Sequence, residues 1–140
     1  MKFLKMEKNR YVKALLIVSG LLGIGIGFAL TFFPIAFEAS AGIDLGEDIN
    51  LLSEIRAPSG VLLIGGILIV LGAFISKLTR TAVLLSSLIY LSYGLSRIVG
   101  VLMDGLPNES LLMALALELI VGSISLFVLF RFNGRQAELV

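Results

Sequence analysis

The chain has 140 residues, of which 58% are hydrophobic and 15% are charged, and its formal net charge is +1. Soluble domains are about half apolar and about a quarter charged, so this composition predicts a membrane protein. The absence of cysteine and histidine excludes thiol redox chemistry, thiolate or imidazole metal ligands, and cysteine or histidine catalysis. We expect no cofactor, no metal site and no nucleic-acid partner.

Four apolar runs approach the roughly 20 residues that are needed to cross about 30 Å of hydrocarbon. They predict membrane-spanning helices at about residues 9–33, 50–76, 81–104 and 109–131. Short links between these helices should make them antiparallel neighbours. The predicted fold class is an all-α, integral membrane four-helix bundle that forms a single domain over residues 1–140.

The first helix should end at Phe33, because the residue before Pro34 is pushed out of the helical conformation. Within this helix Ser19, Gly23 and Gly27 recur every four residues, a spacing that lets helix backbones approach closely in lipid. This face either packs inside the bundle or forms an interface with a second copy. A chain of four helices favours internal packing. The apolar run is about twice the length of a signal-peptide core, so we expect it to be retained.

The acidic connection at residues 35–49 should be irregular, with its first residues along the membrane interface. Asp48 or Asn50 is suited to cap the second helix. Glu54 and Arg56 fall in the first turns of this helix, at the interface or in the mouth of the bundle. Pro58 lies inside the same helix and is expected to kink it.

The third helix carries a polar stripe at steps of three or four residues. Its members are Ser86, Tyr90, Tyr93, Gly94, Arg97, Gly100 and Asp104. A polar stripe on a membrane helix must face other helices or water, so this stripe should line the bundle interior. A tight acidic turn then leads to the fourth helix, which Asn108 should cap and whose first turn contains Glu109.

Basic and acidic residues alternate between successive helix ends. The basic residues are Lys2, Lys5, Lys8, Arg10, Lys13, Lys77, Arg80, Arg131 and Arg135, and the acidic residues of the connections are Glu38, Asp44, Glu47, Asp48, Asp104 and Glu109. The positive-inside bias then places both termini in the cytoplasm. We expect a multi-pass protein of the bacterial inner (cell) membrane.

Four charged residues lie within or beside the apolar runs, namely Glu54, Arg56, Arg97 and Glu118. Each charge at bilayer depth costs roughly a few kcal/mol, so such residues face inward, pair and mark a site. Helix lengths place all four in the outer third of the bundle. The expected ion pairs are Arg97 with Glu118, and Arg56 with Glu54 or Asp104, because arginine suits buried carboxylate pairing.

These charges and the nearby tyrosines form the candidate site. We predict a ligand-binding or buried charge network made of Glu54, Arg56, Tyr90, Tyr93, Arg97, Asp104 and Glu118. One interpretation is the polar floor of an outward-facing pocket, and the other is a salt-bridge network that only determines helix packing.

Several of these motifs together resemble a known family. They are Glu54-Ile-Arg56-Ala57 followed by Gly60, then Tyr93-Gly94-x-x-Arg97-x-x-Gly100, Asp104-Gly105-x-Pro107, and Glu118. The pattern resembles the domain-of-unknown-function 4345 family over roughly Tyr11–Phe132 and is more distantly similar to DoxX-like proteins. The resemblance implies a small bacterial four-helix inner-membrane protein, and it implies no catalytic role.

Three functional hypotheses follow. The first is a site for a small amphipathic or anionic ligand, with lipid, quinone and isoprenoid head groups as candidates. The second is a structural or accessory subunit, in which the charges hold the bundle together and the glycine face contacts a membrane partner or a second copy. The third is a small ion- or proton-coupled transporter, which requires an uncompensated Glu118. We expect no enzymatic activity. A glutamate needs a raised pKa to act as a general acid or base, and the nearby arginines would lower its pKa.

Overall fold

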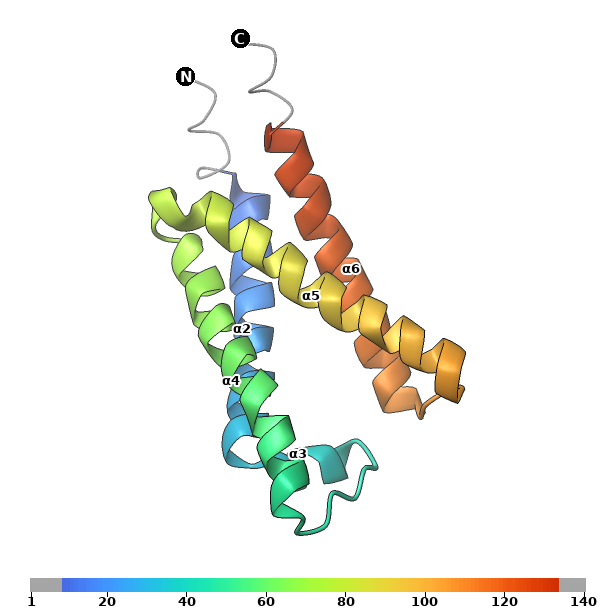
Figure 1. Ribbon diagram of the computed structural model, residues 1–140. Coiled ribbons are helices and arrows are strands. Elements are labelled where there is room, and N and C mark those ends of the chain that lie inside the picture. Colours follow the sequence, from blue (N-terminus) through green and yellow to red (C-terminus); the bar gives the residue numbers. More distant parts are fainter. Residues whose placement is uncertain (1–8, 134–140) are drawn as a thin grey trace.

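The computed structural model describes residues 9–133, and within this range the chain is helical apart from its connections, with no strand (Figure 1). The helices are α2 (Arg10–Phe32), α3 (Pro34–Ser40), α4 (Ile49–Gly72), α5 (Ser76–Asp104) and α6 (Glu109–Asn133). Of the basic residues used to predict the orientation, Lys2, Lys5, Lys8 and Arg135 lie outside the described residues.

The four long helices confirm the predicted all-α fold. Helices α2, α4, α5 and α6 have 23, 24, 29 and 25 residues, and all four are long and apolar enough to cross a membrane. Many of their large apolar side chains are exposed on the outside of the bundle. Such a surface is suited to lipid, so these helices mark the chain as a membrane protein.

Side-chain caps begin three of these helices. The Asn9 side chain accepts from the Tyr11 amide at 2.9 Å, and the Asp48 side chain accepts from the Asn50 amide at the same distance. At the start of α6, Asn108 Oδ1 accepts from the Leu111 amide at 3.1 Å. Each cap satisfies an amide that the first turn leaves without an intrahelical partner.

The connections differ from the prediction in two places. Residues 34–40 form the short helix α3 instead of irregular chain, because Pro34 stands at the first position of that helix, where its missing N–H is not needed. Helix α4 ends at Gly72 and α5 begins at Ser76, so the second link lies earlier than predicted. Thr79 Oγ1 donates to the Gly72 carbonyl at 2.8 Å and satisfies an orphan carbonyl at this helix end. Pro58 lies inside α4 without ending it.

Glycines bring α2 and α4 into close contact along most of their length. A Cβ on Gly66 would lie 2.6 Å from the Ile24 backbone nitrogen, and a Cβ on Gly27 would lie 2.5 Å from the Leu63 backbone nitrogen. The two backbones therefore pack without intervening side chains. Helices α2 and α4 form one pair, and α5 and α6 form a second pair that crosses the first obliquely (Figure 1).

The two pairs are packed together at one end and diverge toward the other. The buried residues of α5 all lie between Thr79 and Gly94, and its last ten residues contain none. Near the divergent end, Asn108 Nδ2 donates to the Ala41 carbonyl at 2.8 Å and connects the α5–α6 turn with the segment after α3.

Charged residues separate between the two ends of the described molecule. Arg10, Lys13, Lys77, Arg80 and Arg131 lie where α2 begins and α6 ends, which we call the basic end. Glu38, Asp44, Glu47, Asp48, Asp104 and Glu109 lie at the opposite, acidic end, where the two helix pairs diverge.

Candidate functional site

An ion pair between α5 and α6 is the centre of the site. Arg97 Nε lies 2.9 Å and 3.1 Å from the two carboxylate oxygens of Glu118, so one N–H is shared between both oxygens. The Glu118 side chain is 12% exposed and that of Arg97 is 34% exposed. The predicted pairing of these two residues is confirmed, and it places a compensated charge pair between two membrane-spanning helices.

Two glycines bring the helices that carry this pair together. A Cβ on Gly94 would lie 2.8 Å from Leu119 Cδ2, and a Cβ on Gly122 would lie 2.7 Å from Leu91 Cγ. Gly94 precedes Arg97 by one turn, and Gly122 follows Glu118 by one turn. The close approach of α5 and α6 at these glycines is what brings the guanidinium within reach of the carboxylate.

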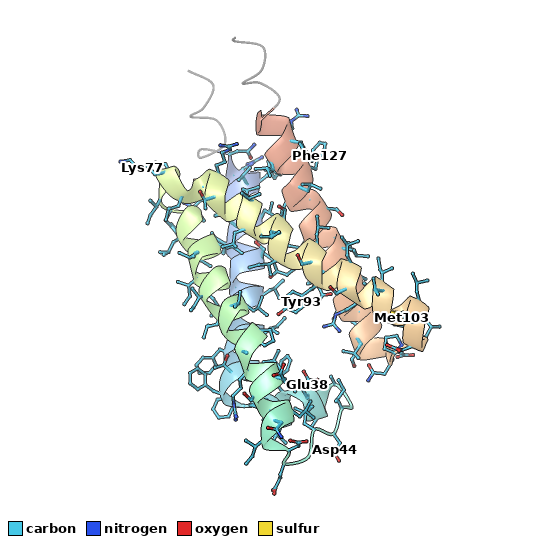
Figure 2. All side chains as sticks on the ribbon, in the orientation of Figure 1. Glu38, Asp44, Lys77, Tyr93, Met103 and Phe127 are labelled. Atoms are coloured by element: carbon cyan, nitrogen blue, oxygen red, sulfur yellow. The ribbon has the colours of Figure 1, made fainter. Side chains whose placement is uncertain are left out.

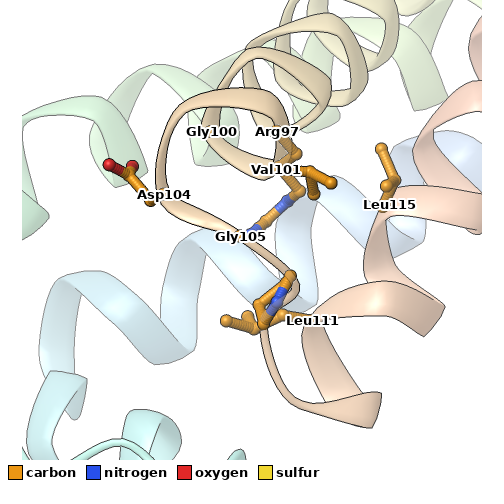
Figure 3. Close-up of a pocket in the computed structure, with 8 residues that line it drawn as sticks. Arg97, Gly100, Val101, Asp104, Gly105, Leu111 and Leu115 are labelled. Atoms are coloured by element: carbon orange, nitrogen blue, oxygen red, sulfur yellow. The ribbon is translucent and has the colours of Figure 1, made fainter.

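Arg97 also lines a hollow at the acidic end. This cavity of about 210 Å³ lies where α5 ends and α6 begins (Figure 3). Its lining residues are Arg97, Gly100, Val101, Asp104, Gly105, Pro107, Leu111 and Leu115. Because Nε alone contacts Glu118, the two terminal amino groups of Arg97 make no hydrogen bond within residues 9–133. The hollow therefore combines apolar walls with the unused hydrogen-bond donors of Arg97.

Glu38 on α3 is a partly buried carboxylate outside the predicted site and outside the lining of the hollow. Its carboxylate is half-buried and makes no hydrogen bond or ion pair among the described residues. Burial raises the pKa of Glu38, and the positive charge of Arg97 offsets part of this rise. In Figure 2 Glu38 lies below Tyr93, toward the acidic end of the molecule. The sequence signal was weak: an acidic residue in the turn that follows Pro34.

Tyr93 stands one turn before Arg97 and is half-buried beside the ion pair, where the charges of Glu118 and Arg97 act on its hydroxyl. Tyr90 is buried in the core instead, and its hydroxyl donates to the Ser19 carbonyl on α2. The structure thus places Tyr93 at the site and gives Tyr90 a packing position between α5 and α2.

Arg56 and Glu54 do not join the Arg97–Glu118 pair. Both are exposed on α4, and Arg56 Nε donates to the Thr31 carbonyl of α2 at 3.1 Å. The predicted pairing of Arg56 with Glu54 or Asp104 is wrong, since Arg56 has no carboxylate partner in the described part of the chain. Residues two apart do not face each other on a helix, and α5 has diverged from α4 before it reaches Asp104. Figure 3 shows the Asp104 carboxylate pointing away from Arg97.

The small-residue face of the first helix lies inside the bundle. Gly23 and Gly27 pack against the backbone of α4 around Leu62, Leu63 and Gly66. Of the two predicted alternatives, the structure therefore shows packing inside the bundle. Ser19 on the same face is fully buried, and its Oγ has no hydrogen-bond partner among the described residues. This face is not available to a second copy.

Comparison with protein families gives a match to the model described as Domain of unknown function (DUF4345), over residues 11–129. The chain belongs to the DUF4345 family. Curated proteins and solved structures give no significant match to the chain.

In this DUF4345 protein the matched region contains Glu38, Tyr93, Arg97, Glu118 and the hollow. Residues 9–133 contain no group of three carboxylates positioned for a metal ion. The amino groups of Arg97 and the Tyr93 hydroxyl can form hydrogen bonds at this site, and the hollow offers apolar contact.

Proposed function

We propose that this membrane protein binds the polar head of a small amphipathic molecule at the acidic end of α5 and α6. The observation that carries the proposal is Arg97, which is held by Glu118 through Nε while its terminal amino groups border a hollow of about 210 Å³. Unused donors beside apolar walls suit a ligand that has acceptor oxygens next to a hydrocarbon part. Lipid, quinone and isoprenoid head groups all fit this description.

The charge of the site favours a neutral or zwitterionic head over a simple anion. Glu118 already compensates Arg97, and Asp104 adds a second carboxylate to the lining of the hollow. A net anionic head would therefore meet excess negative charge, whereas acceptor oxygens on a neutral head are attracted to the amino groups of Arg97.

We further propose that the protein spans the bacterial inner membrane with both termini in the cytoplasm. The basic end of the molecule carries the termini and the α4–α5 link, as the positive-inside bias requires. The hollow then opens to the outer leaflet. Binding without catalysis is the proposed role, because Arg97 engages the Glu118 carboxylate and the Asp104 carboxylate points away from Arg97 (Figure 3).

The test is the intact mass of protein that has been gently extracted from its native membrane. We expect a stoichiometric small-molecule adduct on the wild type and its loss in Arg97→Gln. Arg56→Gln is the matched control, because Arg56 is an exposed arginine outside the hollow, and it should keep the adduct. Circular dichroism verifies that both variants are folded. A wild-type protein without any adduct, in extracts and after addition of lipids or quinones, overturns the proposal.

A second candidate, a structural or accessory subunit, is favoured by the bridge that the Arg97–Glu118 pair makes between α5 and α6. It predicts that Arg97→Gln unfolds the bundle instead of releasing a ligand. The transporter hypothesis requires an uncompensated Glu118, and the contact of that carboxylate with Arg97 removes its support.

A further inference from the structure

Gly100 lines the hollow at a position where no contact requires a glycine. It stands one turn after Arg97 on α5, and a Cβ placed on it would meet no atom within 4 Å. A glycine inside a helix is less favourable than an alanine, because it loses more backbone freedom on folding. The glycine at this position therefore calls for an explanation other than helix stability.

Two other glycines of this region have structural reasons. A Cβ on Gly94 would lie 2.8 Å from Leu119 Cδ2, so Gly94 is needed where α5 packs on α6. Gly105 ends α5 with a φ of +99°, a conformation that favours glycine. Neither reason applies to Gly100, which lies within α5 and has no close neighbour. What its missing side chain affects is the space of the hollow.

Size and charge both restrict what enters this space. The volume of about 210 Å³ is smaller than the roughly 300–1,000 Å³ of pockets for drug-sized ligands, so the hollow accommodates only a small head group. A phosphate would compete with Glu118 for Arg97. A cation would find the carboxylate of the lining, that of Asp104, pointing away from Arg97 (Figure 3). Because an ion without a counter-charge is costly to bury, an uncharged head fits best.

Exposed apolar side chains adjoin the hollow. Leu102 and Leu106 directly follow the lining residues Val101 and Gly105, and they are 80% and 79% exposed. Large apolar side chains with this exposure are suited to contact a hydrocarbon chain. A head group attached to such a chain could therefore enter the hollow while the chain stays outside it.

Resting on the proposed function, we infer that the ligand is an acylglycerol, a lipid with a small uncharged glycerol head, and that Gly100 is the residue that admits this head. The ester and hydroxyl oxygens of glycerol stand on neighbouring carbons, and they accept from the two adjacent terminal amino groups of Arg97. The glycerol carbons lie against the α5 backbone at Gly100. The acyl chain leaves the hollow over Leu102 and Leu106.

The experiment compares three lipids that share one oleoyl chain and differ in the head. Monooleoylglycerol is uncharged, oleoyl lysophosphatidylcholine is zwitterionic and bulkier, and oleate is an anion. Delipidated protein in detergent is incubated with equal amounts of all three lipids, and the bound lipid is read from intact mass spectra. Free glycerol is then added as a soluble competitor with the same head-group chemistry.

We expect monooleoylglycerol to be retained about tenfold over each of the others, the effect of one hydrogen bond to a charged group. Gly100→Leu should lower this retention by about tenfold or more without lowering the unfolding temperature, because the new side chain fills the hollow. Gly25→Leu is the matched control, since Gly25 is exposed on α2, has no atom within 4 Å of its Cβ and does not line the hollow. Gly100→Ala, which adds only the Cβ, should lower retention by a smaller factor and serves if the leucine variant does not fold.

The outcomes separate this inference from the proposed function. Equal retention of all three lipids, or a preference for a charged one, overturns the acylglycerol, and wild-type retention by a folded Gly100→Leu overturns the role of Gly100. Displacement by free glycerol overturns a lipid as the source of the head, whereas resistance to it supports the lipid. A wild type that retains none of the three lipids but carries a native adduct that Arg97→Gln lacks overturns this inference alone. A wild type with neither overturns the proposed function as well.

Discussion

Arg97 and Glu118 share a single N–H across a helix interface, and this geometry makes the two residues interdependent. Removal of one partner leaves the other charge uncompensated between membrane helices, which costs more than removal of both. The Glu118 side chain, at 12% exposure, should be the more sensitive to losing its partner, because Arg97 at 34% exposure retains some access to solvent or to head groups.

A double-mutant cycle tests this coupling. Arg97→Gln and Glu118→Gln should each lower the free energy of unfolding by about 1.5–3 kcal/mol, the range for hydrogen bonds to charged groups. The double variant should lose less than the sum of the two changes, because neither charge is then left unpaired. Thermal unfolding in detergent is the measurement, and Glu47→Gln, at an exposed carboxylate in the connection before α4, is the control. Additive losses would show that the pair is not coupled.

Glu38 should make stability depend on pH in the opposite sense to a salt-bridged carboxylate. Its pKa in the folded protein is raised above the ordinary value of 4.5, so protonation favours the folded state. The ionised Glu38 carboxylate lowers the free energy of unfolding. This loss is complete above the raised pKa and disappears as the pH falls toward 4.5. Glu38→Gln should therefore unfold at a higher temperature than the wild type at pH 7, and at the same temperature below the ordinary pKa. A difference that does not change with pH would contradict this assignment.

Among the helices, α2 and α4 rely on glycine for their contact. The spacing of Ser19, Gly23 and Gly27 predicts a face for close packing, and Gly66 on α4 completes it. Spacing within one helix cannot identify the partner helix, because the partner lies about 40 residues away in sequence and offers a glycine-rich segment of its own.

Two glycines of α2 provide a matched comparison. Gly27→Ala should destabilise the bundle by about 1–3 kcal/mol, since its Cβ would collide with the backbone at Leu63. Gly25→Ala should be neutral or stabilising, because no atom lies within 4 Å of its Cβ and alanine favours the helix. Thermal unfolding of the two variants measures the difference. Equal effects would mean that α2 and α4 do not pack through Gly27.

At the scale of the whole molecule, two helix pairs join at the basic end and diverge at the acidic end. Arg97, Glu38 and the hollow all lie toward the divergent end, so the site depends on how the pairs are arranged rather than on any one helix. Because the chain has no native cysteine, single cysteines can report its orientation without background labelling.

We expect Asp44→Cys in intact cells to react with a membrane-impermeant maleimide, and Lys77→Cys to react only after the membrane is permeabilised. Both positions are exposed and lie at opposite ends of the molecule. The positive-inside bias is the physical reason. The reverse labelling pattern would place the hollow on the cytoplasmic side and would contradict the proposed access from the outer leaflet.

Local sequence was sufficient to locate the four long helices, the Asn108 cap and the Arg97–Glu118 pair. Apolar runs identify spans by length, and an arginine and a glutamate at similar depth in consecutive helices have few other partners. Local sequence did not locate Glu38, and it assigned Arg56 the wrong partner. Both errors concern charges at the divergent end, where small changes in helix direction decide which residues meet.

The sequence by itself therefore determined the membrane character of this protein, its helices and their caps, because these depend on composition and on contacts within a few residues. Only the tertiary structure decided that α2 packs on α4, that α5 leaves them after Gly94, and that Arg97 borders a hollow where α5 ends and α6 begins. Those outcomes depend on which helix faces approach most closely, and that is determined by glycine contacts between segments far apart in the chain.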